Sequence, residues 1–152
     1  MDEKSLQAFF MEIGYPKTQI VPIEPDYMAV FFNEFVTTVK IVGRQLGLNI
    51  SKKLEQAPDY EKLNQINKVT ALGKHILQKE EKGREVRYNY NVVLSIPDNR
   101  ELLKASVKDA IFIAETAYTE LNRETKECSA AEQIKTYYAK RLTGGLELQK
   151  IT

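Results

Sequence analysis

The side chains best suited to catalysis or metal binding are few and lie far apart in the sequence. His75 is the only histidine and Cys128 the only cysteine among the 152 residues. A multi-histidine metal site is therefore excluded within one chain, and a Ser-His-Asp triad would depend on His75 alone. We expect His75 to be a surface or sheet-edge residue and Cys128 to have neither a redox nor a nucleophilic role.

Acidic pairs and phosphate-binding loops give no stronger indication of catalysis than His75 and Cys128 do. Glu80 and Glu81 are adjacent, but they flank an expected turn, where solvated carboxylates are more plausible than a catalytic pair. No glycine-rich loop precedes a helix with the spacing that binds phosphate. Carboxylates distant in sequence can meet in space, so a carboxylate-only hydrolase stays open as an alternative. The sequence predicts a protein that is not an enzyme and that uses no metal or cofactor.

Tyrosines are the candidate partner-binding residues. They are Tyr88, Tyr90, Tyr118, Tyr137 and Tyr138. The first three also occupy apolar positions of an expected strand and an expected helix. Two interpretations stay open for these three: they line a groove, or they belong to the core.

Residues 85–121 are expected to form one strand, one tight corner and one long helix, which the rest of the chain covers. The apolar positions of the strand alternate with mostly polar ones and are Val86, Tyr88, Tyr90, Val92, Leu94 and Ile96. Successive strand residues point to opposite faces, so this strand has one buried face and needs partner strands. Pro97 ends the strand, and Asp98 is expected to cap the helix together with Glu101.

The helix that follows is amphipathic over about 24 residues. Its apolar stripe comprises Leu103, Val107, Ala110, Ile111, Ala114, Ala117, Tyr118 and Leu121. Charged residues fall largely outside the stripe, at Lys104, Lys108, Asp109, Glu115 and Glu120. The stripe is expected to pack in the core, and a part of it in a dimer seam stays open as the alternative.

The first half of the chain offers partners for the strand. Residues 2–13 predict a short helix that ends at Gly14, and residues 19–23 are extended. Residues 27–50 fit either strands, with a turn at Asn33-Glu34, or a helix. We favour strands, because their composition suits a pleated surface and the strand at residues 86–96 needs a sheet.

Further elements follow the same reasoning. A helix is expected to begin with Pro58 in its first turn and to continue through Val69. Residues 72–79 are expected to pair with residues 86–96 as a hairpin around a turn at residues 80–83. A capping box at residues 129–132 opens a last helix, which is expected to stop at Gly144-Gly145 and leave a small apolar tail. That tail contains Leu146, Leu148 and Ile151.

These elements predict an α+β fold. An antiparallel sheet of about four to five strands is flanked by N-terminal, middle and long C-terminal helices, with an extra C-terminal helix. The expected division is an α+β domain at residues 1–125 and a helical extension with a tail at residues 126–152.

Composition limits the partner classes. Hydrophobic residues make up 43% of the chain, charged residues 28%, and the formal net charge is +1. The one basic cluster, at residues 79–87, is interrupted by glutamates, so we do not expect nucleic-acid binding. The N-terminus lacks the pattern of a signal peptide, the most apolar run is too short and too charged to span a bilayer, and one cysteine permits no internal disulfide. We therefore expect a cytoplasmic protein with no membrane association.

The order of helix, strands, helix, hairpin and long helix resembles the type III secretion chaperone-like fold and, within it, the YbjN-like family. The resemblance rests on the opening helix at residues 6–14, on the segment Tyr-Glu-Lys-Leu-Asn-Gln-Ile-Asn at residues 60–67, and on the strand, corner and helix of residues 83–121. It covers roughly residues 4–122. It implies a non-enzymatic, often dimeric domain that holds an extended segment of a partner protein on its sheet and flanking helices.

The leading functional hypothesis is therefore a protein-binding module, chaperone-like or an adaptor, whose partner protein is unidentified. A homodimer stays open. The alternative is a phage or mobile-element inhibitor or regulator of a host protein. A structural or assembly factor is a third class.

Overall fold

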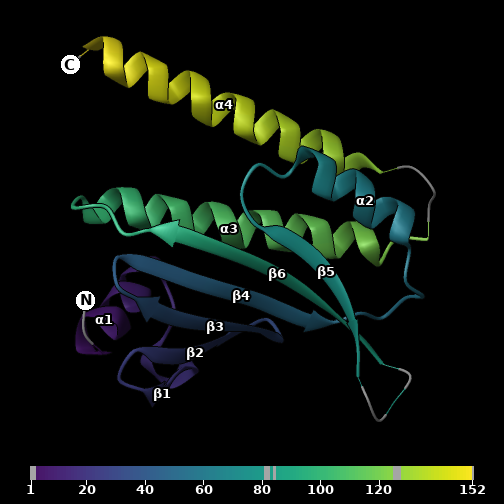
Figure 1. The fold of residues 1–152 in the computed structure, drawn as a ribbon, viewed down its shortest axis with the longest axis horizontal. Coiled ribbons are helices and arrows are strands. Elements are labelled where there is room, and N and C mark those ends of the chain that lie inside the picture. The colour runs from purple at the N-terminus through teal and green to yellow at the C-terminus, as the bar shows by residue number, and fades with distance from the viewer. Residues whose placement is uncertain (1–2, 81–82, 84, 125–127, 152) are drawn as a thin grey trace.

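The computed structural model describes residues 3–80, 83, 85–124 and 128–151. Its helices are α1 (Glu3–Ile13), α2 (Tyr60–Val69), α3 (Arg100–Leu121) and α4 (Ser129–Ile151), with a short 3-10 helix at Lys17–Gln19. Its strands are β1 (Ile20–Glu24), β2 (Tyr27–Phe32), β3 (Phe35–Val42), β4 (Gln45–Lys53), β5 (Lys74–Lys79) and β6 (Val86–Ser95). The expected α+β class is confirmed (Figure 1).

The strands form one open sheet in the order β1-β2-β3-β4-β6-β5, in which every neighbouring pair is antiparallel. Six strands in the described residues exceed the expected four to five. Residues 27–50 supply β2, β3 and most of β4, so the strand interpretation is confirmed. Asn33 and Glu34 form the β2–β3 turn with φ values of 50° and 65°, as the commonest two-residue hairpin turn requires.

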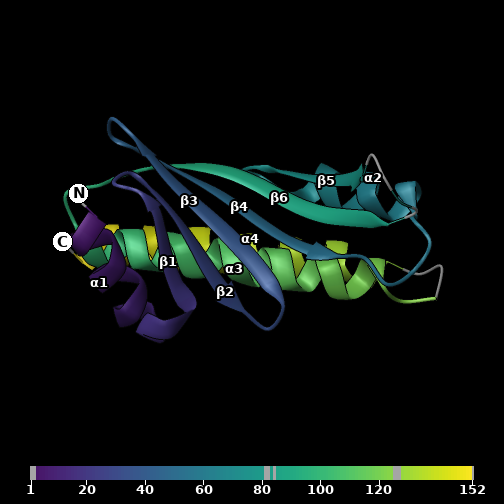
Figure 2. The ribbon, with the colours of Figure 1, turned by 90° about the horizontal axis from the view of Figure 1, so that it is seen from below.

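All four helices lie on one side of the sheet. Figure 1 shows α3 between the sheet and α4, and Figure 2 shows the strands in front of α3 and α4. The core fills the space between α1, α3 and the sheet, with Phe9, Tyr88 and Ala114 fully buried. Ala130 and Ile134 of α4 belong to the same core. Among the residues that the structure describes, no helix covers the opposite face of the sheet, which we call the open face.

The expected face assignment of β6 is confirmed. Its inward residues, Val86, Tyr88, Tyr90, Val92 and Leu94, are all buried. β6 lies between β4 and β5, and the expected hairpin forms, with Lys74 opposite Asn91 and Lys79 opposite Val86. Part of the turn between β5 and β6 lies outside the described residues.

Three expectations about α3 need correction. The cap is Asn99, whose side chain accepts from the Glu101 N–H, and not Asp98. Ile113, which was not assigned to the stripe, is buried in the core, whereas Ile111 is partly buried and packs against the core, because the stripe is rotated slightly around the helix axis. Glu120, expected outside the stripe, is buried.

The expected ends of two other helices are also wrong. Asp59 caps α2 by accepting from the Lys62 N–H, so Pro58 precedes the helix and does not form its first turn. α4 begins at Ser129 itself and continues through Gly144 and Gly145 to Ile151. The packing of the expected apolar tail lies outside the residues whose side chains are described.

A candidate interaction surface on the open face of the sheet

Three of the five candidate tyrosines are in the core. Tyr88 and Tyr90 are 0% and 1% exposed, and Tyr118 is 8% exposed. Their hydroxyls are hydrogen-bonded inside the molecule: Tyr90 donates to the Leu72 carbonyl and Tyr118 to the Lys53 carbonyl. Burial raises the pKa of all three phenols. The core interpretation is therefore the one that the structure supports for these side chains.

The other two tyrosines attach α4 to α3. Tyr137 donates to the carboxylate of Asp109 and stacks on Phe112 at a centroid distance of 4.6 Å. Tyr138 is half-buried and packs against the core. The structure therefore does not bring the five tyrosines together on one surface, and a contact of any of them with a partner stays a prediction.

His75 is on a sheet edge, as expected, but its side chain is buried and only 1% exposed. Its ring stacks on Tyr90 at 4.5 Å and on Tyr88 at 5.8 Å. The register could have located it, because His75 lies opposite the inward-facing Tyr90. Burial lowers the pKa of His75 to about 4. The imidazole is therefore neutral at pH 7.

Hydrogen bonds occupy both nitrogens of His75. The Thr70 hydroxyl donates to the Ile66 carbonyl at 2.7 Å, so toward His75 it can act only as an acceptor. The proton of His75 is therefore on Nε2, 3.0 Å from the Thr70 oxygen, and Nδ1 accepts from the Tyr88 hydroxyl at 2.6 Å. This chain of hydrogen bonds leaves the imidazole without a free nitrogen to act as a base.

Neither Cys128 nor Glu80 lies in an arrangement suited to catalysis. Cys128 is half-buried, and burial raises the pKa of its thiol, which keeps it in the less reactive protonated form. Glu80 is exposed next to the turn, and Glu81 lies outside the described residues. In the part of the chain that the structure describes, no group of three histidine, cysteine or acidic side chains could hold a metal ion.

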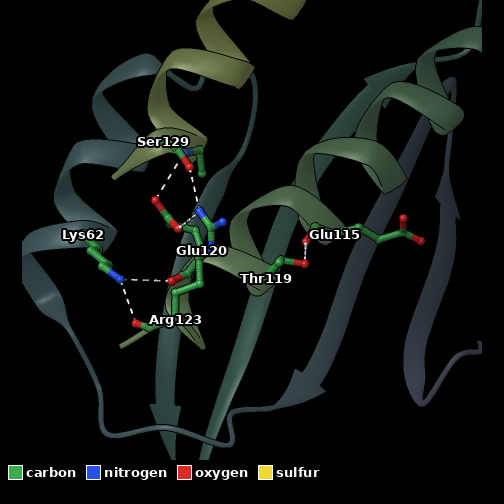
Figure 3. A network of polar contacts seen from close by, with 7 residues as sticks. Lys62, Glu115, Thr119, Glu120, Arg123 and Ser129 are labelled. Atoms are coloured by element: carbon green, nitrogen blue, oxygen red, sulfur yellow. Dashed lines mark hydrogen bonds and ion pairs between the residues drawn. The ribbon is translucent and has the colours of Figure 1, made fainter. Parts of the chain in front are cut away.

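A buried polar junction connects α2, α3 and α4 (Figure 3). Lys62 of α2 is 2% exposed, and its ammonium donates to the carbonyls of Glu120 and Arg123 at 3.2 and 2.8 Å. These carbonyls are at the C-terminal end of α3, where a positive charge is favourable because of the helix dipole.

Glu120 acts at the start of the next helix. Its carboxylate accepts from the Ala130 N–H at 3.3 Å and pairs with Arg123 at 3.3 Å. Glu120 therefore caps α4, a role that was expected of the capping box at residues 129–132. The Ser129 hydroxyl instead accepts from Arg123 at 2.9 Å. Burial alone would raise the pKa of Glu120, but these hydrogen bonds outweigh it and hold the pKa below the usual value. Each polar group of the junction is occupied, so we assign the junction a structural role.

The open face of the sheet, which is turned toward the viewer in Figure 2, is different. Large apolar side chains are exposed on it. The β pairing places Phe31, Val36, Ser51 and Asn89 in one row across the sheet and Lys40, Gly47 and Val93 in another. The apolar residues on this face that are at least one third exposed are Val21, Phe31, Val42, Ile76 and Val93. These five side chains lie on five different strands with polar residues between them, so the uncovered face as a whole, and not one apolar patch, is the candidate interaction surface.

A polar row crosses the centre of this face. Lys74 of β5 lies opposite Asn91 of β6, Asn91 opposite Asn49 of β4, and Asn49 opposite Thr38 of β3. Asparagine is depleted in strands, so two of them side by side in the middle of a sheet are not explained by strand propensity. Residues that contradict a local folding preference are expected to concentrate at functional sites.

A shallow hollow of about 520 Å³ lies along this row. Among the residues that line it are Thr38, Lys40, Gly47, Asn49, Lys74 and Asn91. Gly47 leaves space at its centre: a Cβ there would meet only the Lys40 carbonyl oxygen, at an ordinary contact distance of 3.7 Å. The fold therefore does not require glycine at position 47. A glycine inside a strand is also typical of a place that a ligand or another backbone approaches closely.

Sequence reasoning missed this surface, although the signal was present. Thr38, Asn49 and Asn91 are polar residues of three strands, and none of them was assigned to an interaction surface from the sequence. Their alignment in one row depends on the strand order and register, which alternation within a single strand does not contain.

Comparisons with known proteins identify the fold. No family model matches the chain, and no curated protein matches it either. Among solved structures it is similar to YbjN from E. coli, a proposed transcription regulator, with a TM-score of 0.59, 10% sequence identity, and coverage of 78% of this chain and 90% of that chain. At this identity the likeness concerns the fold alone, and the wider resemblance to secretion chaperones stays a prediction. The chain therefore has a YbjN-like fold.

Proposed function

We propose that the protein is a non-enzymatic protein-binding module, chaperone-like or an adaptor, whose partner binds to the open face of the sheet. The observation that carries this proposal is the uncovered face itself. Its five exposed apolar side chains and its central polar row have no role in the core. The buried chemical groups support the non-enzymatic part, because His75 and Glu120 are both occupied by partners within the fold.

The two edges of the sheet favour binding across the face over addition of a strand. Pro22 in the edge strand β1 has no N–H to offer, and the register shifts between Pro22 and Glu24. At the other edge, the Asn67 side chain accepts from the His75 N–H at 2.9 Å and donates to the His75 carbonyl at 3.0 Å. Asn67 therefore occupies backbone groups that an added strand would need.

Several finer points belong to the same proposal. The division at residues 125 and 126, a cytoplasmic location and a homodimer are all compatible with it. Within the described residues, no helix is long and apolar enough to cross a membrane.

A capture experiment tests the proposed surface. Full-length protein with an affinity tag is incubated with lysate of the source organism, in three forms: wild type, Gly47→Gln and Leu102→Gln. Gly47→Gln fills the hollow without adding charge, whereas Leu102 is 57% exposed on α3, on the helical side. We expect a stoichiometric protein that binds to wild type and Leu102→Gln and is lost from Gly47→Gln. Equal binding to all three forms would contradict the proposed surface.

A further inference from the structure

We infer that the hollow on the open face binds an acidic, extended segment of the partner protein. This inference rests on the proposed function and adds the chemistry of the ligand. It follows from the charges around the hollow, from the hydrogen-bonding groups at its centre and from the dimensions of the sheet.

The charges around the hollow are all positive. Lys40 and Lys74 line it, both are exposed, and no acidic residue is among its lining. Within the described chain, neither of these lysines forms an ion pair. Elsewhere on this face, Lys53 pairs with Glu85 at 2.7 Å, and Arg87 donates to the neutral hydroxyl of Ser51. The net charge of the chain is only +1, so two unpaired lysines here are a local feature.

The centre of the hollow suits a peptide backbone. Asn49 and Asn91 are half-buried on this face and each carries a donor and an acceptor, and Thr38 adds a hydroxyl. From β3 to β5 the row spans three strand spacings, roughly 14 Å, which equals about four residues of an extended chain. The absent side chain of Gly47 lets that chain approach the sheet closely.

Two other occupants fit less well. A second copy of this chain would bring two further unpaired lysines against the first two, which costs free energy through like-charge repulsion. Single-stranded nucleic acid binds to sheets by stacking its bases on exposed aromatic rings, and the hollow is lined by none. An acidic polypeptide satisfies both the charge and the hydrogen-bonding groups.

Fluorescence anisotropy tests the inference with defined probes. The full-length protein is titrated with a labelled eight-residue peptide of alternating glutamate and valine, with its lysine-valine counterpart, and with a labelled ten-nucleotide oligothymidylate. The variant is Lys40→Glu/Lys74→Glu. The control with the same change in charge is Lys108→Glu/Lys135→Glu, whose lysines are exposed on α3 and α4.

We expect the acidic peptide to bind to wild type and to the control, with at least tenfold weaker binding to Lys40→Glu/Lys74→Glu and weaker binding at higher salt. Binding that is unchanged in that variant, equal for the two peptides, or stronger for the oligonucleotide would overturn the inference. Absence of any peptide binding to wild type would overturn it as well.

The two proposals can fail separately. If Gly47→Gln loses the partner captured from lysate while Lys40→Glu/Lys74→Glu retains it, the open face is the binding surface and the acidic segment is wrong. If both variants retain the partner, the proposed function fails together with the inference.

Discussion

The two faces of the sheet differ in what determines their residues. Val92 and Val93 are neighbours in β6, yet Val92 is 4% exposed and Val93 is 61% exposed. On the covered face, hydrogen bonds and packing within the fold account for Tyr88, Tyr90 and His75. On the open face, nothing within the fold requires Asn49, Asn91 or Gly47. Folding therefore accounts for the residues of the covered face, whereas those of the open face are the ones that the proposed partner would explain.

The largest expected effect separates the faces by one residue. Val92→Asp places an unpaired charge in the core and should destabilise the protein by about 3–5 kcal/mol or unfold it. Asn91→Asp is on the open face, and we expect a change within about 0.5 kcal/mol. Urea unfolding of both variants measures the difference. Similar losses in the two variants would show that the faces are assigned incorrectly.

The buried histidine makes the covered face sensitive to pH. Its pKa of about 4 is below the unfolded value of 6.5, so between these values only the unfolded chain gains a proton. The resulting stability is complete above pH 6.5 and is lost as the pH falls, by about 2 kcal/mol between pH 7 and pH 5 and roughly 3 kcal/mol by pH 4. Urea unfolding across this range measures the loss.

The lowered pKa of His75 can also be measured directly. His75 is the only histidine, so a single imidazole signal in an NMR titration reports its pKa directly. A pKa near 6.5 would contradict the buried hydrogen-bond chain.

Two glycines differ in whether the fold requires a glycine at that position. Gly73 has φ of 81°, and a Cβ there would lie 2.5 Å from the Asn91 carbonyl oxygen. Gly73→Ala should therefore cost about 2 kcal/mol. Gly47→Ala should instead stabilise the fold by roughly 0.5–1 kcal/mol, because alanine is favoured over glycine inside a strand. Thermal unfolding of the two variants measures both changes in stability. A loss of stability in Gly47→Ala would refute the claim that the fold does not need this glycine.

A moderate loss of stability is expected at the junction of the helices. Glu120→Gln keeps an acceptor for the Ala130 N–H but removes the charge that pairs with Arg123, so we expect a loss of about 1 kcal/mol at pH 7. The pKa of Glu120 is lowered by folding, so its contribution is complete above pH 4.5 and is lost as the pH falls below that value. Melting temperatures of wild type and Glu120→Gln should therefore converge in acid. A difference that does not depend on pH would show that the carboxylate charge is not what stabilises α4.

The sequence predicted the covered face better than the open one. Alternation in β6 located its five inward residues, because burial imposes a period of two on any half-buried strand. The need of β6 for partners decided residues 27–50 correctly in favour of strands. The same logic could not align Thr38, Asn49 and Asn91, since strand order and register are properties of the folded sheet.

The remaining errors have local causes. Asp98 and Asn99 are adjacent and both can cap, so the sequence did not distinguish them. Glu120 is an acid buried through partners that are far away in the sequence or on the next helix, Lys62 and Ala130. His75 is at a sheet edge, which was one of the two predicted locations, but its burial was not predicted, because the position opposite Tyr90 turns its side chain inward.

The most direct test of the open face is lysine footprinting of the complex. Full-length protein, alone and with its captured partner, is acetylated with an amine-reactive reagent, and mass spectrometry gives the modification of each lysine. We predict that the partner protects Lys40 and Lys74 on the open face and leaves Lys108 and Lys135 on the helical side as reactive as before. Protection of Lys108 and Lys135 with Lys40 and Lys74 unchanged would place the partner on the helices and contradict the proposed surface.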